Sequence, residues 1–192
     1  MDRIPSEVLA GIASVTRAPS LEGWLGSYDP DSARIAIHQD DGDVPIYRRL
    51  RLLATLVHEI GHHVDCRDRF SRARARADRV ELLEDFAEQF AETWIADAVV
   101  PYLEQAYPDE LAAFRRWLVE HAGVELPLEL LVAKDTTALG TADAFEILLR
   151  DVAEGEPPID IQVTLAFNLH YAYHFDLALA ILDGVLAREP DH

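Results

Sequence analysis

The stretch His58-Glu59-Ile60-Gly61-His62 decides the fold around it, because its pattern has a chemical meaning only on an α-helix. Residues four positions apart lie one above the other on the same helix face, so His58 and His62 can offer a ring nitrogen each to one metal ion. Glu59 lies one step around the helix, where its carboxylate reaches a water on that metal more easily than the metal itself. The spacing therefore predicts a helix that carries two metal ligands and one general base.

The residues before the motif predict the helix that carries it. Pro45 suits the first turn of a helix. After it, apolar side chains recur with helical spacing and lead directly into the motif, at Ile46, Leu50, Leu53, Ala54 and Val57. Gly61 costs the helix stability, and it either permits close approach of another backbone or is a small residue for ordinary packing.

Catalytic zinc usually takes three protein ligands, so a third is needed. Asp68 lies six residues after His62, where a third ligand falls in zincins that turn sharply out of the helix. The other candidates lie on the next predicted helix, 81–94, where Glu81, Glu84 and Glu88 share a face. Spacing alone does not choose among these glutamates.

Two segments resemble gluzincin metallopeptidases. His58–Asp65 is similar to the H-E-x-G-H-x-x-D half of their pattern, and Glu84–Phe90 is similar to the E-x-F-A-E-x-F segment that carries their third ligand. The pairing resembles the catalytic domains of the lethal-factor family and its bacterial relatives, over residues 50–92. This resemblance implies that Zn²⁺ is held by His58, His62 and Glu84. The spacing in M1-type aminopeptidases would instead place the ligand at Glu81, and the tyrosine that lethal-factor relatives carry before the ligand has no counterpart between 70 and 83.

The resemblance implies a zinc metallopeptidase that hydrolyses peptide bonds. Zinc would polarise the scissile carbonyl, and Glu59 would take a proton from an activated water and pass it to the leaving amine. The alternative is a zincin-like binding or sensing module that retains zinc and acts through partner recognition, although such a module needs no base at Glu59. Asp65 is either a hydrogen-bond acceptor for a ligand imidazole or a polar residue near the helix end. The oxyanion donor stays open among Tyr102, Tyr171, His170 and Arg74.

Residues 33–39 are the clearest strand signal, because β-branched residues alternate there between two turn-forming segments. The resemblance implies that a peptide substrate would pair with this strand at a sheet edge. We interpret His38 as a side chain on the strand surface and His63 as a surface or packing residue.

Composition indicates one moderately sized globular protein. With 192 residues and 49% apolar content, the chain can bury a core, and we expect an α+β, mostly helical, zincin-like domain over 1–155 with a small sheet. We expect neither a signal peptide nor a membrane segment, and the single cysteine, Cys66, suits a reducing cytoplasmic compartment. The net charge of −18 argues against nonspecific nucleic-acid binding and favours a basic partner or substrate, and the resemblance implies that the substrate is a peptide or a protein. Six arginines within 67–79 form either a solvated connector or a basic loop at the cleft edge.

The end of the chain, 156–192, predicts a helical hairpin. One apolar stripe lies within 165–173 and another within 177–186, and Pro190 closes the pair. The segment resembles a single tetratricopeptide-type unit, and two ordinary packing helices are the alternative. Because one such hairpin cannot bury its own face, we expect it to pack on the zincin-like domain, and it is a candidate surface for a protein partner.

Overall fold

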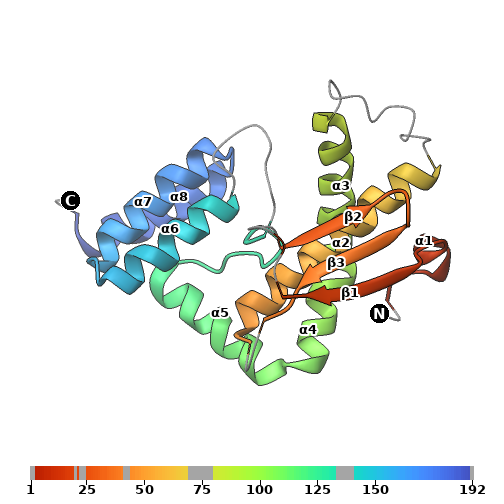
Figure 1. Cartoon of the computed structure of the whole chain (residues 1–192). Helices are drawn as coiled ribbons and strands as arrows, with labels where there is room; N and C mark the ends of the chain where they lie inside the picture. Colours follow the sequence, from red (N-terminus) through yellow and green to blue (C-terminus); the bar gives the residue numbers. More distant parts are fainter. Residues whose placement is uncertain are drawn as a thin grey trace. The chain divides into compact units, whose positions relative to one another are not determined.

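The computed structural model describes residues 3–19, 21, 25–40, 44–68, 80–132 and 141–190, without the side chains of 80–83 and 141–144. The chain divides into two compact units, Met1–Tyr107 and Pro108–His192, and we describe each by itself (Figure 1). The expected boundary at residue 155 falls inside the second unit, between two helices that pack on one another. The C-terminal hairpin is therefore part of a helical unit that begins at Pro108.

A small mixed sheet opens the first unit after the short helix α1 (Ser6–Leu9). Its strands are β1 (Ser14–Ala18), β2 (Gly26–Asp29) and β3 (Arg34–His38), in the order β1-β3-β2. β3 runs parallel to β1 and antiparallel to β2, so it is paired on both sides. The strand predicted at 33–39 is confirmed, but its expected role as a substrate-binding edge strand is wrong, because a central strand has no free hydrogen-bonding edge.

The motif helix α2 (Ile46–Asp68) begins directly after Pro45, as predicted, and packs against β2 and β3. Its apolar stripe is buried at Ile46, Leu50, Ala54, Val57 and Ile60. At the start of α2, Arg48 donates hydrogen bonds from Nε and Nη2 to the two carboxylate oxygens of Asp40, at 2.7 and 3.0 Å. These bonds lower the pKa of Asp40 and connect the end of β3 to the first turn of the helix.

Helix α3 (Val80–Trp94) packs along α2 and continues through a π-helix, η2 (Ile95–Val99), into α4 (Val100–Ala106). The two helices approach each other closely at Gly61 of α2. A Cβ at this position would lie 2.8 Å from Cα and 3.1 Å from the carbonyl oxygen of Ala87, closer than the atoms of a folded chain can tolerate. Of the two roles that the sequence left open for Gly61, the structure therefore supports close approach of another backbone rather than ordinary packing of a small residue.

The second unit consists of the helices α5 (Pro108–Ala122), α6 (Thr141–Glu154), α7 (Pro158–Tyr171) and α8 (Phe175–Arg188). α7 packs against the other three. The fully buried side chains of this unit include Leu118, Phe145, Leu148, Leu165, Leu169 and Ile181. With the mixed sheet of the first unit, these helices confirm the α+β class. In the part of the chain that the structure describes, no helix is both long and apolar enough to cross a membrane.

Replacing Gly61 with Ala tests the helix crossing. Alanine is the better helix former by about 1 kcal/mol, but here its methyl group would force α2 and α3 apart, at a cost of about 1–3 kcal/mol. We expect Gly61→Ala to lower the free energy of unfolding, measured by urea denaturation.

Gly184 on α8 provides a matched control, because a Cβ there meets no atom within 4 Å. Gly184→Ala should raise the free energy of unfolding by up to about 1 kcal/mol. A Gly61→Ala protein as stable as the Gly184→Ala protein would contradict the close crossing.

Candidate metal centre

The second half of α2 presents the motif side chains as the spacing predicts. His58 and Glu59 are buried, at 9% and 7% exposure, whereas His62 is partly accessible. The rings of His58 and His62 lie edge to face, with their centroids 4.7 Å apart. One helical turn thus brings two imidazoles to the same place, with a buried carboxylate beside them.

Glu84 on α3 supplies a third donor. Its Oε2 lies 3.3 Å from Nε2 of His58, and its Oε1 lies 3.5 Å from Nε2 of His62. These separations exceed the usual hydrogen-bond length of about 2.9–3.0 Å. Each imidazole faces a different oxygen of the Glu84 carboxylate. The three side chains lie close enough together that they could hold one metal ion.

Among the described His, Cys, Asp and Glu residues, these three form the group whose ligand atoms lie close enough together to hold one metal ion, all within 4.8 Å of one another. We refer to them as the convergent group. Two imidazoles with one carboxylate suit a transition metal. Catalytic zinc sites usually have three protein ligands and a fourth position for water or substrate, whereas structural zinc sites usually have four protein ligands.

The other candidate ligands do not join this group. Asp68, the last residue of α2, accepts hydrogen bonds from the guanidinium of Arg67, and these bonds lower the pKa of Asp68. Glu88 lies one turn beyond Glu84 on α3 and is not part of the convergent group. The side chain of Glu81 lies outside the described residues.

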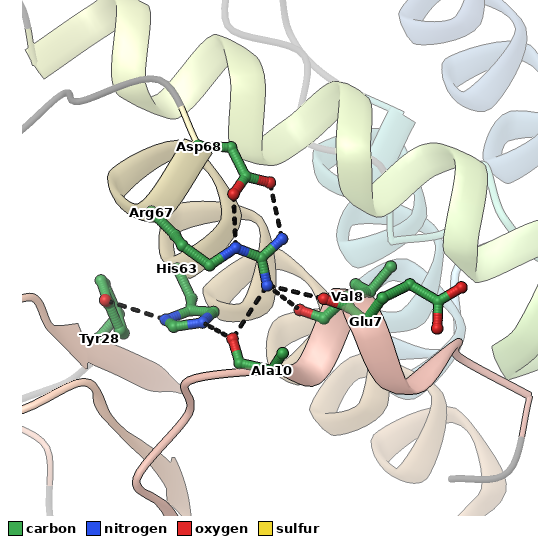
Figure 2. Close-up of polar contacts among 7 residues, drawn as sticks. All are labelled: Glu7, Val8, Ala10, Tyr28, His63, Arg67 and Asp68. Atoms are coloured by element: carbon green, nitrogen blue, oxygen red, sulfur yellow. Dashed lines mark hydrogen bonds and ion pairs between the residues drawn. The ribbon is translucent and has the colours of Figure 1, made fainter.

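Arg67 has a structural role at the end of the motif helix. Its Nη1 donates hydrogen bonds to the carbonyl oxygens of Glu7, Val8 and Ala10, at 2.8, 3.3 and 2.9 Å (Figure 2). These carbonyls lie at the C-terminal end of α1, where they have no partner within that helix. The remainder of the Arg-rich segment, 69–79, lies outside the described residues, so both interpretations of it stay predictions.

His63 anchors the sheet to the motif helix. Its Nε2 lies 3.0 Å from the carbonyl oxygen of Ala10, and its Nδ1 lies 3.1 Å from the hydroxyl of Tyr28 on β2 (Figure 2). A carbonyl only accepts, so Nε2 donates, and in the neutral ring the Tyr28 hydroxyl donates to Nδ1. At 4% exposure, His63 is a packing residue, and the surface interpretation is excluded.

The edge strand β2 runs beside Glu59. A Cβ at Gly26 would lie 3.0 Å from Oε1 of Glu59 and 2.6 Å from Cγ2 of Thr55, so only glycine lets the strand approach this closely. β2 was missed in the sequence because Gly26–Asp29 is short and has no apolar alternation. It is the strand of the sheet that the structure places next to the motif.

Asp65 and the candidate oxyanion donors are the last site residues expected from the sequence. Asp65 is buried, at 3% exposure, one turn after His62, and its hydrogen bond to a ligand imidazole stays a prediction. Tyr102 on α4 lines cavities whose walls include none of the three ligands or Glu59. His170 and Tyr171 belong to the second unit, and Arg74 lies outside the described residues.

Single substitutions separate the third-ligand candidates. Glu84→Ala should weaken zinc binding by more than roughly 100-fold, because even partners that only orient a ligand are worth 10–100-fold. Glu88→Ala, a matched change on the same helix, and Asp68→Ala should have little effect. The readout is zinc affinity by competition with a chromophoric chelator. Loss of the metal in Asp68→Ala but not in Glu84→Ala would contradict the assignment, and equal loss in Glu81→Ala would move the ligand one turn earlier.

Comparisons with protein-family models, with curated proteins and with solved structures return no match for this chain.

Proposed function

We propose that this chain is a zinc-dependent metallopeptidase of the gluzincin type. One observation carries the proposal: His58, His62 and Glu84 form a group that could hold one metal ion, and the buried carboxylate of Glu59 lies on the same helical turn as the two histidines. A site that only stabilised the fold would need no acid–base residue beside it and would usually have four protein ligands.

The proposed roles follow from the donor set. His58, His62 and Glu84 would hold the zinc. When bound, zinc supplies Lewis acidity, which polarises a carbonyl group and lowers the pKa of a water toward ~7. Glu59 would take the proton of the attacking water and deliver it to the leaving nitrogen. The carboxylate is buried and lies beside Gly26 of β2, which limits the room it has to move, and proton transfer requires a base within hydrogen-bond distance.

The proposed substrate is a peptide or a protein segment in extended conformation. β2 is an edge of the sheet and passes next to Glu59, so a peptide that paired with β2 would present its main chain to the centre. Tyr28, bound to His63, holds this strand in place. We propose that the substrates are cytoplasmic, because the single cysteine of the chain suits a reducing compartment.

Glu59→Gln tests the mechanism separately from metal binding. The amide keeps the size of the side chain but does not accept a proton, so zinc content and unfolding temperature should stay near those of the unchanged protein. Cleavage should fall by roughly 10²-fold or more, as expected for loss of a positioned general base. Cleavage is measured on a proteome-derived peptide library by quantifying new N-termini.

Glu92→Gln is the matched control, because Glu92 is exposed on α3 and makes no part of the centre. It should leave both zinc content and cleavage unchanged. If Glu59→Gln cleaves as fast as Glu92→Gln, or if the zinc-loaded wild-type chain cleaves nothing in the library, the chain is better explained as a zinc-retaining binding or sensing module.

A further inference from the structure

The C-terminal hairpin presents a large apolar surface to solvent. Helices α7 and α8 and the turn between them expose side chains that are 46–70% accessible. We refer to this surface as the aromatic patch; it consists of Phe167, Tyr171, Tyr173, Phe175, Leu179 and Leu186. All six residues belong to the second unit.

The patch is a second apolar face, distinct from the one that packs in the core. On α8, Ala178, Ile181 and Val185 are buried, whereas Phe175, Leu179 and Leu186 are exposed. The chain is 27% charged, yet no charged residue occurs from Ile161 through Phe175. The four aromatic residues of the patch all lie within this uncharged stretch.

The area of the patch is sufficient for a protein interface. An aromatic side chain offers about 150–250 Å², so the four exposed rings alone present on the order of 500 Å², and the two leucines add to this. Exposed apolar patches beyond a few hundred Å² mark interaction sites. A specific interface of standard size covers about 800 Å² on each partner, which the patch and its polar rim would provide.

The turn of the hairpin supports a surface role for Tyr173. The N–H of His174 bonds the carbonyl of Leu169, and the N–H of Tyr173 bonds that of His170, which is the Schellman ending of α7. This ending places Tyr173 at φ 63°, a conformation usually taken by glycine. The ring of Tyr173 meets Phe175 edge to face, with centroids 6.0 Å apart, but 70% of the residue stays exposed, so a backbone conformation that costs strain holds an aromatic side chain at the surface.

The patch also contains a groove between its two helices. The groove has a volume of about 320 Å³, with Ala166 and Ala178 at its floor and Phe167, Phe175 and Leu179 among its walls. A cavity of about 150 Å³ accommodates a benzene ring, so this groove can seat an aromatic side chain. Small residues at the floor and exposed rings at the rim make the surface complementary to itself.

We propose that the aromatic patch is the interface of a symmetric dimer, in which α7 and α8 of one chain pack on α7 and α8 of a second copy. In a two-fold contact the same patch serves both partners, so a surface with both rings and a groove can meet its own complement. A second copy suits the part of the patch that holds the four rings, because residues 161–175 carry no charged side chain, while Asp176 and Asp183 lie beside the leucines on α8. The dimer does not depend on the metal centre.

Sedimentation velocity of the full chain from roughly 1 to 500 μM tests the proposal, because micromolar dissociation constants correspond to about 8 kcal/mol of binding free energy. We expect a monomer–dimer equilibrium that strengthens with added salt, because salt screens the repulsion between two acidic chains. Leu179→Glu should raise the dissociation constant at least about tenfold. Val119→Glu, a matched change at a 44% exposed valine on α5 outside the patch, should leave it unchanged.

Tyr173→Gly separates association from folding. Glycine takes the positive φ without strain, so the unfolding temperature of this variant should equal or exceed that of the unchanged chain, while its dimer weakens several-fold. A wild-type chain that stays monomeric over the whole concentration range would overturn the proposal. So would a dimer that Leu179→Glu and Val119→Glu weaken equally, or one that Tyr173→Gly leaves unchanged.

Discussion

The contact between Gly61 and Ala87 is the constraint on which the candidate centre depends. His58 and His62 lie on α2 and Glu84 lies on α3, so the distances between their donor atoms are set by how closely the two helices cross. A side chain at position 61 would keep the helices apart, and Glu84 would then lose its reach to both imidazoles. Gly61 lowers the helix propensity of α2, but its missing side chain lets α3 come close enough for Glu84 to reach both histidines.

The helix and its motif could be predicted from the sequence, because each has a local signal. Helical spacing of apolar residues gives α2, the i and i+4 histidines give two ligands on one face, and the strand at 34–38 follows from alternation. The identity of Glu84 among three glutamates needed the resemblance to gluzincins, since Glu81, Glu84 and Glu88 are equivalent by spacing. The structure places Glu84 between the histidines.

Contacts between segments far apart in the chain could not be predicted in this way. β3 pairs on both sides and is the central strand, so β2 is the edge strand beside Glu59. No local pattern at Gly26–Asp29 predicts this arrangement. The bonds from Tyr28 to His63 and from Arg67 to the end of α1 also join segments that are distant in sequence. The boundary at Tyr107 was missed for a related reason, since α6 and α7 pack together although Gly155 and the prolines after it suggested a division.

The central claim is that a metal ion lies between two helices, held by His58, His62 and Glu84. Anomalous diffraction at the zinc absorption edge, from crystals of the zinc-loaded full chain, tests this most directly. We expect a single strong peak per chain, within about 2.0–2.2 Å of Nε2 of both histidines and of a carboxylate oxygen of Glu84. A peak bound by other residues, or no peak at all in a chain that retains its fold, would contradict the account.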